Sequence, residues 1–333
     1  MSKRTMCSFC DGLIQAPPFR VEEMMMGTRE QFEYFICDKC GSLHIADVPV
    51  NLGNYYPKDY YSFRKIEYTP MKSLLRVLRF HFIVKCFYRG WPAFYLQFLR
   101  SIGVNETAVE SIGKLKTQKS ISVLDIGAGN GYLLQDLKNL GFTNLIGVDR
   151  YIDASFVSNG LRILKSDVFG LSPDLKFDLI IYNHSLEHVQ NPCADVIEAC
   201  GHLKENGVIM ISIPIVAYAF RIYGKSWFQL DAPRHLNIPS LEGLFAFAHK
   251  IGLSVTGYYF NSGPSQLLIS EQYAKNIPFS DRDHFSIVAL FKKFVSSSYH
   301  DSVRIASILN EKNSGDSAVF YLKKTPAYDP GKS

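Results

Sequence analysis

The feature that most constrains the fold is the alternation of short apolar runs with helical stretches that begins at Ile121. The apolar runs have the length of buried strands, and the stretches between them carry the apolar spacing of helices. Strands that alternate with helices predict crossover units and a mainly parallel sheet, which is the α/β class. The expected strands are 121–126, 145–148, 162–164, 177–182, 208–213, 254–260 and 318–323, and the expected helices are 131–140, 193–203 and 241–251.

A glycine-rich turn follows the first of these strands and reads Asp-Ile-Gly-Ala-Gly-Asn-Gly from Asp125 to Gly131. Glycines let the backbone turn sharply and approach a ligand with no Cβ in the way. Ligands of parallel sheets bind beyond the carboxyl ends of the strands, where this turn lies. The dinucleotide fingerprint would place its third glycine at Tyr132, and the turn lacks the Gly-Lys-Ser/Thr of a triphosphate loop. An acid just before the turn favours a ligand that carries an ammonium group.

Taken in order, several segments of the chain resemble the class I S-adenosylmethionine-dependent methyltransferases. The segments are 123–131, 146–149, 166–168, 177–180, 186–189 and 203–208. The resemblance implies a Rossmann-like, seven-stranded, mostly parallel sheet with S-adenosylmethionine as cofactor. By analogy, the turn and Asp125 hold the methionine part, Asp149 accepts both ribose hydroxyls, and Asp167 accepts from the adenine amino group. The cofactor-binding residues that the resemblance implies are Asp125, Gly127, Ala128, Gly129, Gly131, Asp149, Asp167, Val168, Asn183 and Leu186.

Four of the seven cysteines form two Cys-x-x-Cys pairs: Cys7, Cys10, Cys37 and Cys40. Two such knuckles let four thiolates converge on one zinc ion, and the Asp-Gly or Gly after each pair lets backbone amides face the sulfurs. The segments 19–23 and 31–36 between the pairs can form a hairpin. We therefore expect a structural zinc ribbon, which is not catalytic because protein fills all four positions. Four ordinary buried thiols are the alternative.

The composition describes a folded chain with a modest charge. Hydrophobic residues make up 47% of the 333 residues, charged residues make up 20%, and the net charge is +5. This mild charge is compatible with nucleic acid but does not predict it, and we expect no DNA partner. Residues 1–61 hold no Lys/Arg cluster mixed with stacking aromatics, and the Asn/Asp-Pro-Pro-Tyr/Phe motif is missing after the fourth strand, which argues against RNA. The first ten residues lack the apolar core of a secretory signal, and charged residues interrupt the apolar stretch 71–103, so we expect a cytoplasmic protein. The expected domains are a zinc ribbon (1–50), a tyrosine-rich lid or linker with helices (51–115) and a cofactor-binding domain (116–333) with a helical insertion (262–316). The helices predicted in the insertion are 265–273, 286–295 and 301–310.

Two segments between the ribbon and the sheet have open interpretations. The tyrosine-rich stretch 54–63 fits a seam between domains or a lid over a ligand equally well. The predicted helix 71–99 carries aromatic and basic residues, so it could rest on a membrane surface, or it could pack its apolar stripe on the core. A monomer and a homodimer are both compatible with the sequence.

A second resemblance concerns the acceptor. The ribbon, the Tyr-Tyr-Pro-x-x-Tyr-Tyr-Ser stretch and the class I domain together resemble enzymes of sugar and surface-polysaccharide pathways, including zinc-bearing sugar C-methyltransferases. This second resemblance implies that the acceptor is a small molecule, either a sugar or a nucleotide-linked sugar. The segment 227–240 corresponds to the one that carries the catalytic histidine in those enzymes, and His235 is the match.

A histidine suits the role of general base because its pKa lies near the working pH. Asp231 or Glu187 would orient the ring of His235, His188 would contact the acceptor, and Arg234 or Arg221 would hold a phosphate of the acceptor. The alternative for His235 is a cap on the helix that follows it.

Other functions remain open at the level of the sequence. Some rRNA methyltransferases also place a zinc ribbon before a class I domain, so an rRNA or tRNA methyltransferase is the main alternative. A non-enzymatic adaptor is another. His184 to His188 spell the His-x-x-Glu-His of a zinc protease, but that chemistry needs both histidines on one helix, and this segment directly follows a buried strand and soon reaches Pro192.

Overall fold

The computed structural model describes residues 6–56, 108–158, 161–280 and 297–325. The predicted helix 71–99, most of the tyrosine-rich stretch and a predicted helix at 286–295 lie outside these residues. Among the described helices, none is both long and apolar enough to cross a membrane.

The described part of the chain forms one large sheet, with the strand order β11-β12-β9-β8-β4-β5-β7-β6. Strands β4, β5, β7, β8 and β9 run parallel to their neighbours in this set, whereas β12 is antiparallel to both β9 and β11. The strands are β4 (Ser122–Ile126), β5 (Asn144–Val148), β6 (Phe156–Ser158), β7 (Leu161–Leu164), β8 (Phe177–Asn183), β9 (Leu203–Pro214), β11 (Leu253–Phe260) and β12 (Ser317–Lys324).

All seven predicted strands are present in this sheet, which confirms the Rossmann-like α/β class. An eighth strand, β6, was missed; it pairs antiparallel with the outer edge of β7 and has three residues, too few for an apolar pattern to show. The chain leaves β4 toward β5 and β7 on one side and returns to β8 and β9 on the other. The glycine turn after β4 therefore stands where the strand order reverses, which is the usual ligand position in such sheets.

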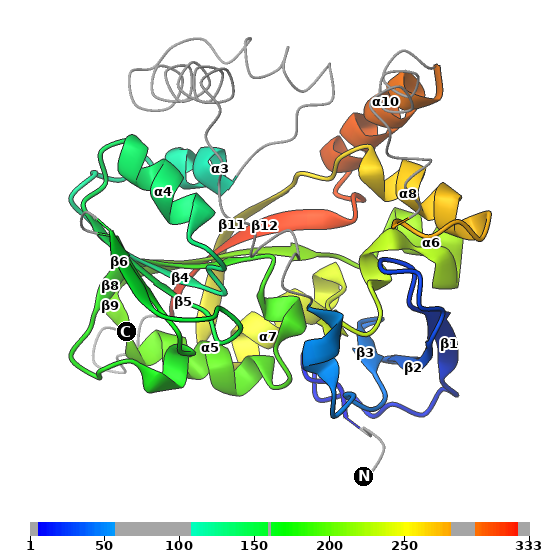
Figure 1. Cartoon of the computed structure of the whole chain (residues 1–333), viewed down its shortest axis with the longest axis horizontal. Coiled ribbons are helices and arrows are strands. Elements are labelled where there is room, and N and C mark those ends of the chain that lie inside the picture. Colours follow the sequence, from blue (N-terminus) through cyan, green and yellow to red (C-terminus); the bar gives the residue numbers. More distant parts are fainter. Residues whose placement is uncertain (1–5, 57–107, 159–160, 281–296, 326–333) are drawn as a thin grey trace, which may run out of the picture.

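Helices cover both faces of the sheet (Figure 1). Helices α3 (Ala108–Lys114) and α4 (Tyr132–Asn139) lie on one face, and α5 (Pro192–Gly201) and α7 (Leu241–Lys250) lie on the other. Alternate side chains of a strand point to opposite faces, so Val123 packs with Leu134 of α4 while Leu124 belongs to the cluster that contains Val196 of α5. The predicted helices at 131–140, 193–203 and 241–251 are thereby confirmed.

Three further helices lie beyond one end of the sheet: α6 (Tyr218–Tyr223), α8 (Ser265–Ala274) and α10 (Ser297–Glu311). Helix α8 and helix α10 fall in the segment expected as a helical insertion before the last strand, and they match two of the helices predicted there. Helix α6 contacts α8, and α8 contacts α10, so the three form one group (Figure 1).

A second, smaller sheet is built from the first fifty residues and one distant segment. Its strands are β1 (Phe19–Glu22), β2 (Gln31–Ile36), β3 (Leu43–Ile45) and β10 (Asn237–Ile238), all antiparallel. The predicted hairpin of 19–23 with 31–36 is confirmed. Strand β10 carries the chain directly after His235 into this sheet, and the ring of Phe9 packs edge-on against Phe247 of α7 at 5.7 Å. The cysteine-bearing segment and the larger sheet therefore share a hydrophobic core.

Candidate cofactor and acceptor site

The glycine turn adopts the sharply turning backbone that its three glycines predict. Gly127, Gly129 and Gly131 have φ angles of 79°, 52° and 75°, in the left-handed region that favours glycine. A Cβ on Gly127 would lie 2.4 Å from the Cβ of Ser185, whose hydroxyl donates to the carbonyl oxygen of Ile126 at 2.6 Å. The turn is therefore locked against the end of β8 and tolerates no side chain at its first glycine.

An open cavity lies at the carboxyl ends of the parallel strands. Three of the residues expected to bind the cofactor line it: Gly127, Asp149 and Asp167. The others lie in the same turn or in the adjoining strand ends; Val168 and Leu186 are buried there. The remaining lining residues are Tyr56, Ile126, Val148, Arg150, Tyr151, Ser166, His184, Ser185, His188, Val189 and Asp195.

Two acids meet under the glycine turn. Asp149 follows β5 and accepts hydrogen bonds from the amides of Gly129 at 2.9 Å and Tyr151 at 2.8 Å, so it fixes the turn as well as facing the cavity. A carboxylate has further lone pairs for ligand hydroxyls. Asp125 is buried in β4, and its burial and the charge of Asp149 raise its pKa to about 7. A cationic ligand in the cavity would therefore favour ionised Asp125.

Asp167 begins a short 3-10 turn, Val168–Gly170, and accepts from the amides of Phe169 and Gly170. Its other oxygen lies 3.0 Å from Nη2 of Arg150, another residue of the cavity wall. Sequence reasoning missed Arg150, because one arginine after a strand carries no pattern. Arg150 and Asp167 bridge the loops after β5 and β7, and they form the edge of the cavity where the resemblance places adenine.

Tyr56 closes another side of the cavity. Its ring stacks on Tyr151 with centroids 4.9 Å apart, and its hydroxyl lies 3.0 Å from Nδ1 of His188. The neighbouring Tyr55 is instead buried and hydrogen-bonds to Glu30. The two interpretations of this stretch therefore apply to different residues. Tyr55 packs inside the protein, as at a seam between domains, and Tyr56 lies at the cavity, as a residue over a ligand would.

The two acceptor-side histidines lie next to each other, with ring centroids 4.8 Å apart. His188 lines the cavity, while His235 lies behind it and its side chain is 8% exposed. Nδ1 of His188 lies 2.9 Å from the carbonyl oxygen of Arg234, and Nδ1 of His235 lies 2.6 Å from that of Gln229. A carbonyl oxygen only accepts, so both Nδ1 atoms carry the proton and both Nε2 atoms are left as acceptors in the neutral rings.

Glu187 completes this group. Its side chain is fully buried, and neither carboxylate oxygen has a hydrogen-bond partner among the described residues. Oε1 lies 3.9 Å from Nε2 of His235 and 3.4 Å from Nδ1 of His184. Burial opposes its ionisation, but the neighbouring imidazoles, His184 first, outweigh burial and lower the pKa of Glu187. We call Glu187, His188 and His235 the acceptor-side cluster.

Asp231 and Arg234 have different roles from those expected. Arg234 is fully buried and donates to Asp231 at 2.6 Å and to Glu23 at 3.0 Å, so the expectation that it holds a phosphate of the acceptor is wrong. Asp231 lies 3.8 Å from Nε2 of His235 but is bound primarily to Arg234, whose charge outweighs burial and lowers the pKa of Asp231. Asp231 thus supports the His235 loop rather than the ring alone.

The structure also rules out two alternatives for the histidines. Helix α7 is capped by Ser240, whose hydroxyl accepts from the amide of Gly243, so His235 is not the cap. The His-x-x-Glu-His segment is not the single helix of a zinc protease, because His184 has a φ of 51° and only Leu186–His188 form a 3-10 turn.

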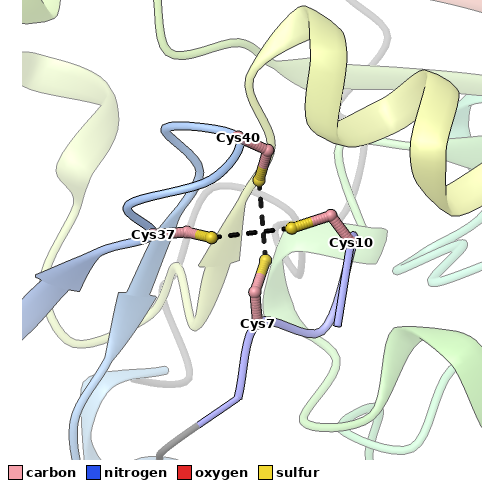
Figure 2. Close-up of side chains that lie close together, drawn as sticks. All are labelled: Cys7, Cys10, Cys37 and Cys40. Atoms are coloured by element: carbon pink, nitrogen blue, oxygen red, sulfur yellow. Dashed lines mark hydrogen bonds between the residues drawn. The ribbon is translucent and has the colours of Figure 1, made fainter. Parts of the chain in front are cut away.

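The four N-terminal cysteines converge on one point (Figure 2). The Sγ atoms of Cys7 and Cys40 lie 3.6 Å apart, as do those of Cys10 and Cys37. A tetrahedral site with Zn–S bonds of about 2.3 Å separates its sulfurs by about 3.8 Å, so the four thiols fit a zinc ion. The amide of Phe9 donates to the sulfur of Cys7 at 3.4 Å, as expected of a knuckle. His44, which sequence reasoning missed, links Cys7 to Asn237 of β10.

Comparison with known proteins supports the cofactor side of this site. Residues 103–257 match the model of a family described as a methyltransferase domain. A ubiquinone biosynthesis O-methyltransferase of Pelagibacter ubique (strain HTCC1062) is 30% identical over 123 residues, which are 34% of this chain and 51% of that protein. The enzyme of the same name from Glaesserella parasuis serovar 5 is 32% identical over 136 residues, 36% of this chain and 54% of that protein. The chain thus spans about half the length of the curated relatives it matches.

Similar solved structures have low sequence identity. They include a cyclopropane synthase from Mycobacterium tuberculosis, with a TM-score of 0.41 and 17% identity over 64% of this chain and 81% of that one. Coclaurine N-methyltransferase has a TM-score of 0.39 and 13% identity over 83% of this chain and 99% of that one. The family match, with the strand order and the glycine turn observed here, identifies residues 103–257 as a class I S-adenosylmethionine-dependent methyltransferase domain.

Proposed function

We propose that this protein transfers a methyl group from S-adenosylmethionine to a small molecule. The observation that carries the proposal is one continuous cavity that has Gly127, Asp149 and Asp167 on one wall and His188 on another. Gly127, Asp149 and Asp167 are the positions that the resemblance assigns to the cofactor. The imidazole of His188 lines the same cavity, so an acceptor bound beside it would lie next to the cofactor. The curated relatives are named as O-methyltransferases, which agrees with a hydroxyl as the methylated group.

For the cofactor, we propose the residues that the resemblance implied. Asp149 would accept the ribose hydroxyls with the lone pairs that Gly129 and Tyr151 leave free, and Asp167 would accept from the adenine amino group. The turn from Gly127 to Gly131 and buried Asp125 would hold the methionine part. When bound, the cofactor supplies a methyl carbon already activated by the sulfonium. The chain itself has to position the acceptor and remove its proton.

For the proton, we propose the acceptor-side cluster. The Nε2 atoms of His188 and His235 are free to accept because each Nδ1 donates to a backbone carbonyl. His188 is proposed to contact the acceptor because it lines the cavity. His235, whose ring centroid lies 4.8 Å from that of His188, remains the proposed base. Such bases contribute about 10²–10⁴ in rate. His235→Ala is therefore expected to retain S-adenosylhomocysteine binding and to lose most turnover.

For the acceptor, we propose a sugar, most simply a nucleotide-linked one. The support is the order of the cysteine pairs, the Tyr-Tyr-Pro stretch and the methyltransferase domain, together with Tyr56 from that stretch at the cavity wall. For the four cysteines we propose a structural zinc ion, because protein sulfurs fill all four positions.

The experiment is incubation with methyl-labelled S-adenosylmethionine and a panel of nucleotide sugars, scored by mass spectrometry of the products. A catechol-type phenol in the same panel tests the acceptor class that the names of the relatives suggest. Methylation of a nucleotide sugar supports the sugar proposal, and methylation of the phenol alone overturns it. Calorimetry that shows no binding of S-adenosylmethionine or S-adenosylhomocysteine would overturn the methyltransferase proposal itself.

A further inference from the structure

The acceptor-side cluster holds a buried carboxylate with no hydrogen-bond donor. Glu187 is fully buried, and both of its oxygens lack a partner among the described residues. An unpaired buried carboxylate is costly, because neither water nor a donor replaces the hydration that it loses. The nearest ring nitrogen is Nδ1 of His184, at 3.4 Å from Oε1, and a bound cation would compensate the carboxylate more fully.

The net charge of the groups around Glu187 also favours a bound cation. Three carboxylates and one guanidinium are linked here. Arg234 is paired with Glu23 and Asp231, and Nε2 of His235 lies 3.8 Å from Asp231 and 3.9 Å from Glu187. With neutral histidines these four groups sum to a charge of about −2 inside the protein. Arg234 is already committed to Glu23 and Asp231, so the groups nearest to Glu187 are the imidazoles of His184 and His235, at 3.4 Å and 3.9 Å. A divalent cation would balance this charge.

Both imidazoles are oriented as metal ligands are. Metal-bound histidines generally donate their second ring nitrogen to a carbonyl or a carboxylate, which fixes the ring and leaves the other nitrogen for the metal. Nδ1 of His188 is 2.9 Å from the carbonyl oxygen of Arg234, and Nδ1 of His235 is 2.6 Å from that of Gln229. Both carbonyl oxygens belong to the segment between Phe228 and Arg234 that leads into β10, so one segment orients both rings.

The three groups are close enough to share one ion. Glu187, His188 and His235 each offer one ligand atom, and these atoms all lie within 4.8 Å of one another. Ligand atoms on one ion, with bonds of about 2.0–2.2 Å, are separated by about 3 to 4.4 Å, so small rotations of the side chains would close the site. Two imidazoles and one carboxylate are a ligand set for zinc, iron or cobalt rather than for magnesium or calcium.

We propose that Glu187, His188 and His235 bind a divalent transition-metal ion at the inner wall of the cavity. Three protein ligands leave coordination positions open, and His188 places them toward the cavity, where an oxygen of the acceptor would bind. The metal site rests on this geometry alone, whereas its use in methyl transfer rests on the proposed function. In the metal-bound state the ion takes the lone pair of His235, so an acceptor hydroxyl would lose its proton to water while its oxygen is bound to the ion.

The test uses Co²⁺ as a probe on the whole protein, after zinc has been supplied to fill the cysteine site. We expect one further equivalent of Co²⁺, with weak visible d–d bands and without the intense thiolate charge-transfer band of a cysteine site. Glu187→Gln and His235→Asn should lose this equivalent. The matched control is His202→Asn, because His202 is also a buried histidine whose Nδ1 lies near a carbonyl oxygen, that of Leu175, but it lies outside the cluster.

Thermal unfolding separates binding from a folding defect. Without metal, the unfolding midpoint of Glu187→Gln shows whether this variant folds as the wild type does. With Co²⁺, the midpoint should rise for the wild type and for His202→Asn but stay unchanged for Glu187→Gln. No second equivalent in the wild type, or equal uptake by Glu187→Gln, would overturn the proposal and leave an ion pair of Glu187 with a protonated imidazole. The assay contains neither methyl donor nor acceptor, so its result is independent of the methyltransferase proposal.

Discussion

Nη2 of Arg234 lies 3.0 Å from Oε1 of Glu23, and both side chains are fully buried. Glu23 directly follows β1 of the small sheet, whereas Arg234 immediately precedes His235, so this ion pair ties the cysteine-bearing segment to the loop of the proposed base. Arg234 also donates to the carbonyl oxygen of Tyr55, next to the cavity residue Tyr56. The ion pair therefore positions two walls of the acceptor side at once.

Replacing Arg234 by methionine should be strongly destabilising. The substitution keeps an apolar chain of similar length but leaves Glu23 and Asp231 as uncompensated buried charges, which costs about 3–5 kcal/mol. Urea unfolding measures this loss. The control is Arg221→Met, because Arg221 is exposed and its replacement should change stability by about 0.5 kcal/mol or less. Equal stability of the two variants would contradict a stabilising role of the buried ion pairs of Arg234 with Glu23 and Asp231.

Asp149→Ala should weaken S-adenosylhomocysteine binding by at least about tenfold, which corresponds to about 1.4 kcal/mol. The substitution removes the proposed acceptor of the ribose hydroxyls and frees the amide of Gly129, so the glycine turn loses its anchor. Isothermal titration calorimetry measures the affinity. Asp174→Ala removes an exposed acid elsewhere in the domain and should bind normally. Unchanged affinity of Asp149→Ala would remove Asp149 from the cofactor site.

Gly127→Ala should impair both folding and cofactor binding. The new Cβ would lie 2.4 Å from the Cβ of Ser185, and the φ of 79° is unfavourable for alanine, so the turn must shift. Overpacking of this kind costs about 1–3 kcal/mol. Gly201→Ala is the control, because a Cβ there meets nothing within 4 Å and the position is in helix α5. Thermal unfolding and calorimetry should show a loss for Gly127→Ala alone.

Removing zinc from the cysteine site should destabilise more than the first fifty residues. Strand β10 pairs with β3, and His44 joins Cys7 to Asn237, so loss of the metal should also disturb the loop of His235. We expect a chelator, or Cys37→Ser, to lower the unfolding midpoint and turnover together. Cys200→Ser serves as the control, since Cys200 lies in helix α5, away from the four clustered cysteines. Metal analysis that shows no zinc in the purified protein would contradict this site.

Asp316 should make stability fall as the pH rises. It is buried, and burial raises its pKa to about 7 although Trp227 donates to it at 2.9 Å. Because the folded state holds this proton more tightly than the unfolded state, the stabilisation is full below about pH 4 and is lost as the pH rises to about 7, at up to about 1.4 kcal/mol per pH unit. Asp316→Asn should reduce this slope, and buried Asp125, whose pKa is also raised to about 7, should account for part of what remains. Urea unfolding at pH 5 and pH 8 measures it, and exposed Asp174→Asn should keep the wild-type slope.

The main sheet and the glycine turn could be predicted because their signals are local. Each strand is a run of apolar residues, and the turn after β4 needs a left-handed backbone at Gly127, Gly129 and Gly131 that little besides glycine adopts. The cysteine pairs were equally clear, because two short motifs suffice for four ligands. The three-residue edge strand β6 escaped prediction, since a period cannot be read from so few residues.

The acceptor side could be predicted only in part. His235 and His188 were recognised as residues, but their order, with His188 at the cavity and His235 behind it, depends on how distant loops pack. Arg234 is a charged residue next to a histidine in the sequence, which suggested a phosphate contact. Its burial against Glu23, more than two hundred residues away, is invisible to any local pattern.

The sequence alone determined the α/β sheet, the glycine turn at the cavity and the two cysteine pairs, because apolar periodicity, glycine content and cysteine spacing are properties of a few neighbouring residues. Only the tertiary structure decided that β10 completes the small sheet, that Glu187 is buried without a hydrogen-bond partner among the described residues, and that Arg234 pairs with distant Glu23. These features depend on burial and on the pairing of charges between remote segments. Such energies arise only when the folded chain excludes water from them.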